Sequence, residues 1–494
     1  MGKLIFDYVP LTFISDKGEI KKQIRNTLIL IHLFEKYNNP VRLEKLIEGT
    51  QYGYNASALQ SGNNKFLRIS DIHESKVNWE TVPYCNCDDE ETYVLKNDDI
   101  LIARTGGTTG KSFKINNPPK DSIYAGYLIR IRAKATVNPD YLYLFLHSFA
   151  YWSQIVNLNE RNFRPKANAE NLKSLILPEC PKAVQDEAVL ISQGQKIIGY
   201  EGLYAEIETA LSEYDKAQKV QDLLSDQLIQ LENLNQAILQ EAVQGKLVKQ
   251  NPKDEPASEL LKRIKAEKAK SGKKEKPLPP IKPAEIPFKI PESWVWCRLG
   301  EICDKLHYGY NASAKPERKE VRLLRITDIQ ENNVDWESVP GCEYSNSDFE
   351  NFLLNENDIV IARTGGTIGK TYIVKDISVK ALFASYLIRA VPSKNTNSNF
   401  MKYFMESPLY WKQLYGAAWG AGQPNVNATA LSILIFPFSP LSEQTRIVAE
   451  IEKQLAKTKQ LKENIIANQL ATEQLLKALL HAAFEVKEKE EVNN

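Results

Sequence analysis

The heptapeptide IARTGGT occupies residues 102–108 and returns unchanged at residues 361–367. A second motif, YGYNASA, fills residues 52–58 and returns unchanged at residues 308–314. From the first IARTGGT onward, the register holds at an offset of 259 residues. Several motifs that recur in the same order indicate a duplicated domain, and the period is far too long for a solenoid. The sequence therefore predicts one domain that occurs twice, in a pseudo-two-fold molecule with a two-part target.

The two copies are expected at residues 41–182 and 295–440, and each is predicted to be a mixed α/β domain. Short runs of branched apolar residues are typical of strands, as in DILIA at residues 99–103 and YLIRI at residues 127–131. Helix-like runs such as residues 139–156 follow them.

A long amphipathic run follows each copy. From Leu203 to Val243, and again after Ser442, apolar residues recur with a period close to that of an α-helix. A helix with one apolar stripe must bury that stripe, and the other long helix is the economical partner. We expect two spacer helices, at residues 183–250 and 441–487, that form an antiparallel coiled coil. The alternatives are that each helix packs on its own domain or on a partner protein. Three glycines are expected to break the first turns of the first spacer helix: Gly194, Gly199 and Gly202.

Two segments have no counterpart in the other copy. Residues 1–40 carry apolar residues at helical spacing from Ile20 to Phe34, which predicts a short helix that packs on the spacer or on a partner. Residues 251–294 are predicted to be a linker that is basic at residues 262–276 and stiffened by prolines beyond them. This linker is interpreted either as a solvated connection or as an arm that contacts phosphates.

Charge and cysteine content exclude several classes of protein. The 494 residues include 63 Lys and Arg against 62 Asp and Glu, so the chain has neither a global basic field nor an acidic, solvating composition. Six cysteines without a C-x-x-C pair do not make a disulfide framework and favour a reducing compartment. We find neither an apolar run of bilayer length nor a secretory signal. The expectation is a cytoplasmic protein that does not associate with membranes.

The glycine-rich motif resembles a phosphate-binding loop without being one. Residues 105–112 read TGGTTGKS, but Thr105 stands where the P-loop pattern requires its first glycine, and Thr364 does so in the second copy. The residues after each loop look like strands, so the dipole of a following helix is missing. We therefore do not expect this chain to bind ATP.

The chain also lacks a recurring catalytic set. Asn117-Pro118-Pro119 is followed by Lys120 rather than by the aromatic residue of amino-methyltransferases, and no Gly-x-Gly loop for a methyl donor is present. The five histidines are scattered, and none recurs between the copies at metal-ligand spacing. We therefore expect a chain that is not an enzyme and that holds no metal or cofactor.

The residues that do recur are suited to contacts with nucleic acid. Arginine fits guanine edges, asparagine fits adenine edges, and lysine and tyrosine reach phosphates. The competing structural interpretation is that Gly106-Gly107 merely connects strands, that Arg104 pairs with a core acid, and that Asp71 serves the fold. The candidate DNA-binding residues are Tyr52, Tyr54, Asn55, Ser57, Arg68, Arg104, Thr105 and Lys111 in the first copy, and Tyr308, Tyr310, Asn311, Ser313, Arg325, Arg363, Thr364 and Lys370 in the second.

The order of these parts resembles the specificity subunit of type I restriction–modification systems. The resemblance covers roughly residues 41–485 and rests on the duplicated domains and the two long helices. Three stretches add to it: IPFKIPESWVW at 286–296, LLKRIKAEKA at 260–269 and LSEQ at 441–444. It implies that each copy is a target-recognition domain that reads one half of a split DNA site. The paired helices would then set the spacing of the half-sites and dock two modification subunits.

The same resemblance implies where the cofactors bind. Modification subunits would hold S-adenosylmethionine and methylate adenine, separate restriction subunits would use ATP and Mg²⁺, and the present chain would need no cofactor. This sequence departs from the family pattern in two places. The first copy lacks the Pro-Glu-Ser-Trp approach found at residues 291–294, and its spacer opens with Val184-Gln185-Asp186-Glu187 instead of Leu-Ser-Glu-Gln.

Two other classes of function remain as alternatives. One is a catalytic chain, either a fused methyltransferase or a nuclease, and the absent methyl-donor loop argues against it. The other is a tandem-domain coiled-coil adaptor for proteins, which nothing in the sequence contradicts.

Overall fold

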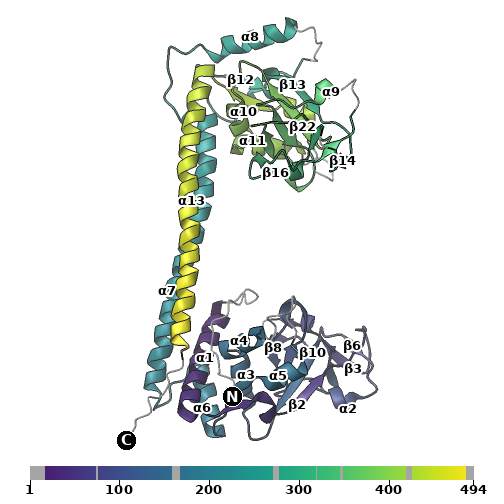
Figure 1. Cartoon of the computed structure of the whole chain (residues 1–494), viewed down its shortest axis with the longest axis vertical. Helices are drawn as coiled ribbons and strands as arrows, with labels where there is room; N and C mark the ends of the chain where they lie inside the picture. The colour runs from purple at the N-terminus through teal and green to yellow at the C-terminus, as the bar shows by residue number, and fades with distance from the viewer. Residues whose placement is uncertain are drawn as a thin grey trace. The chain divides into compact units, whose positions relative to one another are not determined.

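The computed structural model describes residues 17–73, 76–157, 167–270, 277–318, 320–344, 349–418 and 426–485. The chain divides into two compact units, which are coloured along the chain in Figure 1. Unit 1 comprises Met1–Leu224 and Ala467–Asn494, and unit 2 comprises Ser225–Ile466. Each unit contains one copy of the repeat together with one part of each long helix.

A four-stranded antiparallel sheet forms the centre of the first copy. Its strands are β2 (Ile47–Tyr52), β7 (Ile100–Ala103), β8 (Ser112–Lys114) and β10 (Leu128–Ala133), in the order β2-β10-β7-β8. Because successive side chains point to opposite faces, Ile100 and Ile102 enter the core that also holds the helices, whereas Leu101 enters a second core. The sheet is thus buried on both faces, which explains its continuous apolar runs.

Smaller elements complete the first copy. Strand β3 (Asn64–Leu67) pairs in parallel with β9 (Ser122–Tyr124) and antiparallel with β6 (Tyr84–Cys85). Two further pairs are β1 (Pro40–Arg42) with β11 (Ile176–Pro178) and β4 (Ile72–His73) with β5 (Lys76–Val77). The helices are α2 (Glu90–Tyr93), α3 (Pro139–Leu146), α4 (Phe149–Asn157) and α5 (Ala169–Ser174).

The second copy repeats this topology. Its central sheet is β13 (Cys303–Tyr308), β22 (Leu387–Pro392), β19 (Ile359–Ala362) and β20 (Thr371–Ile373), in that order. Its small sheet is β14 (Ala314–Lys315), β18 (Gly341–Cys342), β15 (Arg322–Leu324) and β21 (Ala381–Phe383). Further pairs are β12 (Val295–Arg298) with β23 (Ile435–Phe438) and β16 (Ile329–Gln330) with β17 (Asn333–Val334). The helices are α9 (Phe349–Phe352), α10 (Ser398–Phe404), α11 (Pro408–Ala418) and α12 (Ala428–Ser432). The predicted mixed α/β domain and its duplication are confirmed.

The two long helices are α7 (Glu201–Val243) and α13 (Leu441–Ala483). In unit 1, Gln221 Nε2 donates a hydrogen bond of 2.6 Å to the Gln469 carbonyl, and Leu480 of α13 enters the same core as Leu203 of α7. In unit 2, Thr458 Oγ1 donates to Asn235 Oδ1 over 2.7 Å. Within each unit the helices therefore run antiparallel, as the predicted coiled coil requires.

The break expected near the start of the first spacer is present. Helix α6 (Lys182–Ser192) ends before Gly194 and Gly199, which have φ angles of 90° and 97°. A side chain would be strained at these left-handed angles, so glycine is the residue that allows the turn. The long helix consequently begins at Glu201, not near residue 183.

Helix α6 nevertheless occupies the place of the first turns of α13. Gln185 Oε1 accepts a hydrogen bond of 2.9 Å from the Asn138 backbone, and Gln185 Nε2 donates to the Cys180 carbonyl over 2.8 Å. In unit 2, Gln444 Oε1 accepts from the Asn397 backbone over 2.8 Å, and its Nε2 donates to the Ser439 carbonyl over 2.7 Å. The glutamine, and not the whole Leu-Ser-Glu-Gln motif, is therefore what both copies share.

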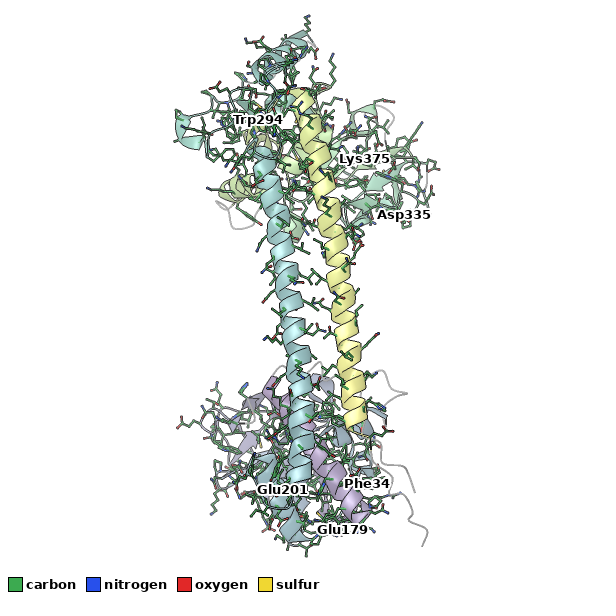
Figure 2. All side chains as sticks on the ribbon, turned by 90° about the vertical axis from the view of Figure 1, so that its left-hand side faces the viewer. Phe34, Glu179, Glu201, Trp294, Asp335 and Lys375 are labelled. Carbon is green, nitrogen blue, oxygen red and sulfur yellow. The ribbon has the colours of Figure 1, made fainter. Side chains whose placement is uncertain are left out.

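The N-terminal segment forms α1 (Lys17–Tyr37), which packs into unit 1 as predicted. Asn26 Nδ2 donates to the carbonyl of His147 over 2.7 Å, and Lys21 pairs with Asp215 of α7 over 2.6 Å. Figure 2 shows Phe34 on α1 and Glu201, the first residue of α7, in the same part of this unit. The short helix is thus built into the spacer end of its unit.

The predicted linker contains α8 (Ala257–Lys270), whose apolar face is buried in the core of unit 2. Its basic residues pair with neighbouring acids, among them Lys262 with Glu259 over 2.8 Å and Lys265 with Glu301 over 2.7 Å. The interpretation as a solvated linker is wrong for this stretch, because its apolar side chains pack on the domain. Residues 271–276 of the basic window lie outside the described part of the chain.

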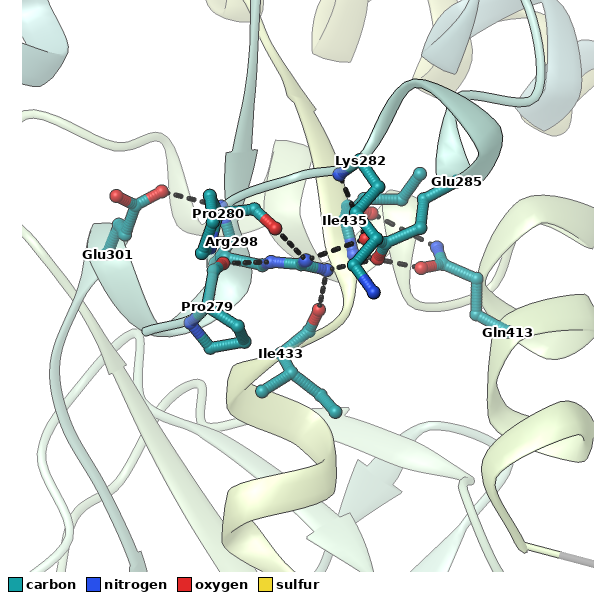
Figure 3. Close-up of polar contacts among 9 residues, drawn as sticks. All are labelled: Pro279, Pro280, Lys282, Glu285, Arg298, Glu301, Gln413, Ile433 and Ile435. Carbon is teal, nitrogen blue, oxygen red and sulfur yellow. Dashed lines mark hydrogen bonds and ion pairs between the residues drawn. The ribbon is translucent and has the colours of Figure 1, made fainter. Parts of the chain in front are cut away.

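The proline-rich stretch after α8 is held in place by Arg298 (Figure 3). Its guanidinium, on a side chain only 6% exposed, donates to the carbonyls of Pro279, Pro280 and Ile433 over 3.0, 3.1 and 2.6 Å. It also pairs with both carboxylate oxygens of Glu285, over 2.8 and 3.1 Å. The hydrogen bond from Arg298 lowers the pKa of Glu285. One buried arginine therefore joins the segment before the second domain to that domain.

Candidate nucleic-acid interface

One edge of each central sheet gathers residues from four separate places in the sequence. In the first copy β2 and β7 end at the edge where β10 and β8 begin, because all neighbouring strands are antiparallel. Neighbouring strands lie ~4.8 Å apart, so four positions at this edge span about 15 Å. We call these four residues the edge row: Tyr52, Tyr127, Arg104 and Lys111 in the first copy, and Tyr308, Tyr386, Arg363 and Lys370 in the second.

The arginine of each edge row stacks on the tyrosine at the end of the neighbouring edge strand. The Arg104 guanidinium carbon lies 4.9 Å from the ring centre of Tyr52, and that of Arg363 lies 4.6 Å from the ring centre of Tyr308. Each tyrosine hydroxyl accepts a backbone hydrogen bond, from Ala169 over 3.1 Å and from Ala428 over 3.2 Å. The ring is thereby anchored, and the cation–π contact holds the guanidinium plane while its donors stay available.

Among the described residues, no carboxylate pairs with Arg104 or Arg363. The interpretation of Arg104 as the partner of a core acid is therefore wrong. The buried acid of the sheet, Asp99, is instead bound by Arg132 over 2.7 Å, and its counterpart Asp358 is bound by Arg389 over 2.6 Å. Other arginines thus satisfy the core, and the edge arginine is left for recognition.

The glycine loop beside each arginine is open above its backbone. Gly106 and Gly107 precede Gly110 in the turn that contains η3 (Gly106–Thr108). A methyl group added at Gly106 or Gly107 would meet no atom within 4 Å, whereas at Gly110 it would lie 2.8 Å from the Trp152 ring. Gly110 is thus required by packing, and Gly106 by its φ of 84°. Strand β8 follows the loop as predicted, so no helix N-terminus points at it. Thr105, and Thr364 in the second copy, make no side-chain capping bond.

The YGYN motif divides into an anchored half and an exposed half. The ring of Tyr54 packs 5.2 Å from that of Tyr93, and that of Tyr310 packs 5.3 Å from that of Phe352. Burial raises the pKa of Tyr54. Tyr54 and Tyr310 thus contribute to the small-sheet cores. The other motif candidates are exposed to solvent: Asn55, Ser57, Asn311 and Ser313.

The remaining candidate arginines are occupied locally. Arg68 binds both oxygens of Asp71, with Nε–Oδ2 of 3.0 Å and Nη2–Oδ1 of 2.7 Å. Arg325 binds Asp328 in the same way, over 3.0 and 2.6 Å. This hydrogen bond raises the pKa of Arg68. The structural interpretation of Asp71 is confirmed, and a DNA contact by Arg68 or Arg325 stays a prediction.

The sequence reasoning missed one member of each edge row. Tyr127 is 68% exposed and Tyr386 is 66% exposed, and each lies just before the second strand of its sheet. Their carbonyls accept hydrogen bonds from the backbones of Arg104 over 2.9 Å and Arg363 over 3.1 Å. Both tyrosines are visible in the repeated YLIR sequence, but that run was interpreted only as a strand.

Other surfaces are less suited to nucleic acid. A groove of about 380 Å³ in unit 1 lies between α1, α7 and α13, and its lining includes Glu35, Glu206 and Glu213. Carboxylates repel phosphate, so this groove does not fit the DNA backbone. Within the described ranges, no cluster of His, Cys, Asp and Glu could hold a metal ion. None of the helices described is long and apolar enough to cross a membrane.

The fold and the two edge rows define a tandem-repeat α/β protein with paired long helices. Residues 291–470 match the family described as type I restriction modification DNA specificity domain. The specificity subunit of the Escherichia coli type I restriction enzyme EcoAI is 38% identical over 261 residues, which are 51% of this chain and 44% of that protein. That of EcoEI, also from Escherichia coli, is 28% identical over 271 residues, with 51% and 45% covered. The chain thus spans about half the length of the curated relatives it matches.

A solved structure shares the fold. It comes from work on the "structural basis underlying complex assembly and conformational transition of the type I R-M system", and it matches with a TM-score of 0.53 at 15% identity. The match covers 90% of this chain and 97% of that one. The likeness extends beyond residues 291–470 and therefore includes the first copy.

Proposed function

We propose that this chain is the DNA-recognition subunit of a type I restriction–modification complex. The observation that carries the proposal is the edge row, which brings an arginine, a lysine and two tyrosines together in both copies. Each domain reads one half of a bipartite site in double-stranded DNA. The family that residues 291–470 match and the specificity subunits that resemble this chain support the same function.

The proposed chemistry assigns different tasks to the edge residues. Arg104 presents two parallel N–H donors, which match the O6 and N7 acceptors of guanine. Tyr52 limits the rotation of the guanidinium, so less conformational freedom is lost on binding. Lys111 neutralises a phosphate and contributes affinity without base preference. Asn55 and Ser57 extend the interface from an exposed loop.

The remaining parts of the complex lie on other chains. In this proposal the two long helices set the spacing of the half-sites and dock two modification subunits. Those subunits bind S-adenosylmethionine and methylate adenine, and restriction subunits use ATP and Mg²⁺. The present chain is not catalytic, needs no cofactor and has no membrane partner.

Methylome sequencing of the host, with and without this chain, tests the proposal. We expect methyl-adenine at one split sequence motif, and its complete loss when the chain is deleted. Highly purified chain, supplied with S-adenosylmethionine and a duplex carrying that motif, should leave the DNA unmodified and uncut. Methyl transfer by the chain alone would contradict the proposed division of labour, and an unchanged methylome would contradict the function.

A further inference from the structure

Comparison of the two copies isolates one unexplained side chain. Among the described residues, three pairs of matched positions expose a large apolar side chain in both copies: Tyr52 with Tyr308, Tyr127 with Tyr386, and Val156 with Tyr415. The first pair is explained by the stacked arginines. The third differs in residue type. Only Tyr127 and Tyr386 keep the same residue without a structural reason.

The fold gives Tyr127 and Tyr386 nothing to do. Neither side chain makes a hydrogen bond, ion pair or ring contact with another described residue. The residues before them differ, Gly126 in one copy and Ser385 in the other, so the local turn is not simply copied. A surface residue that is retained without a packing contact is better explained by binding than by stability.

The sheet edge indicates what these tyrosines bind. Tyr127 precedes β10, the strand between β2 and β7, so its backbone lies between those of Tyr52 and Arg104 at the edge. The backbone hydrogen bond from Arg104 to the Tyr127 carbonyl keeps the two residues side by side. On duplex DNA, tyrosine hydroxyls characteristically contact phosphates, whereas arginine and asparagine read base edges.

We propose that Tyr127 and Tyr386 each donate a hydrogen bond from the phenol to a phosphate of the half-site read by the neighbouring arginine. This inference rests on the proposed function and adds the residue that fixes the position of the arginine over its base. The contact positions the domain and carries no base preference of its own. Tyr127 and Tyr386 are therefore positioning residues for Arg104 and Arg363.

Removal of one hydroxyl tests the assignment. The full-length chain is titrated with a mixed-sequence duplex and with a pool of randomised sites, for Tyr127→Phe, Tyr386→Phe and the double variant. A hydrogen bond to a charged group supports a loss of about tenfold in affinity for each single variant. The loss should be the same for every sequence. The thermal midpoint should not change, because the phenol has no partner in the fold.

Two matched variants separate this contact from the others. Lys111→Gln removes a charge and should lower the slope of log K against log salt by about 0.9. Tyr127→Phe removes no charge and should leave that slope unchanged. Tyr37→Phe, which alters a tyrosine of α1 outside the edge row, should leave DNA binding as it was.

The outcomes distinguish the inference from the function on which it rests. If Arg104→Ala changes base preference while Tyr127→Phe binds like the wild type, the phosphate contact is refuted and the proposed function stands. A change of base preference in Tyr127→Phe also refutes the phosphate contact. If the wild-type chain does not bind duplex DNA, both the contact and the proposed function fail.

Discussion

Arg104 shows how neighbouring residues can prepare one side chain for recognition. Its ring partner Tyr52 is fixed by a backbone hydrogen bond from Ala169, and the core acid Asp99 is already bound by Arg132. The guanidinium is therefore oriented without being neutralised. The second copy reproduces this arrangement with Arg363 and Tyr308.

Substitution of the edge arginines should affect one half-site each. Arg104→Ala should weaken or relax recognition of one half, and Arg363→Ala of the other, with a loss of ~1–3 kcal/mol for a bidentate guanine contact. A randomised-site binding assay measures the change. Thermal melting is the control and should not change, because no ion pair is lost. A less stable domain with unaltered base preference would contradict this role.

Arg298 provides the contrasting case of an arginine used for the fold. Arg298→Ala would leave three carbonyls and Glu285 without their donor, and we expect a loss of about 3 kcal/mol in the stability of unit 2. Lys262→Ala is a suitable control, since its exposed pair with Glu259 is worth at most ~1 kcal/mol. Thermal unfolding of the two variants measures the difference. Equal midpoints would show that Arg298 does not hold the proline-rich stretch.

At the level of elements, close crossings of backbone fix the position of the edge. Gly53 follows the end of β2, and a Cβ at that residue would lie 2.2 Å from the carbonyl oxygen of Ala125. Gly309 makes the same approach to Ala384 at 2.2 Å. The glycine between the two tyrosines of the motif therefore allows the central sheet and the small sheet to meet.

A glycine substitution tests this crossing. Gly53→Ala must displace backbone and should destabilise unit 1 by ~1–3 kcal/mol, as overpacking does. Gly49→Ala lies in the same strand, where an added Cβ meets no atom within 4 Å, and should be tolerated. Chemical denaturation of the two variants provides the comparison. Similar stability for both would contradict the requirement for glycine at Gly53.

The paired helices lead to a prediction about spacing. Four residues inserted near Leu228, with a matching insertion in α13, add ~6 Å of helix. This length corresponds to roughly two base-pair steps of ~3.4 Å. The spacer between half-sites should lengthen while both half-sites keep their bases, as measured by methylome sequencing. Altered half-sites with an unchanged spacer would count against the role of the helices.

At the scale of the whole molecule, duplication implies related half-sites. Because both edge rows contain the same reading groups, the two halves should share at least some bases, as an imperfect inverted repeat if the pseudo-two-fold symmetry predicted from the sequence holds. Differences should arise from loops that do not match, such as residues 59–65 against 315–321. Exchange of these loops should transfer the difference between the halves, measured by selection from a randomised pool. Half-sites without a common base would contradict shared readout.

The sequence by itself determined the duplication, the mixed α/β class, the long helices and the recurring nucleic-acid-binding residue types. These features depend on local periodicity and on identity between the copies, which need no knowledge of packing. The glycine break before Glu201 was also predictable, because left-handed backbone favours glycine wherever it occurs.

Only the tertiary structure decided which candidates act together. Tyr52, Tyr127, Arg104 and Lys111 become neighbours through the strand order β2-β10-β7-β8, which follows from long-range pairing and not from local sequence. The same packing assigned Arg68 to Asp71, placed Tyr54 in a core and turned the basic stretch of α8 into a paired, packed helix. A residue type states what a side chain can bind, but its role depends on whether another part of the chain has already bound it.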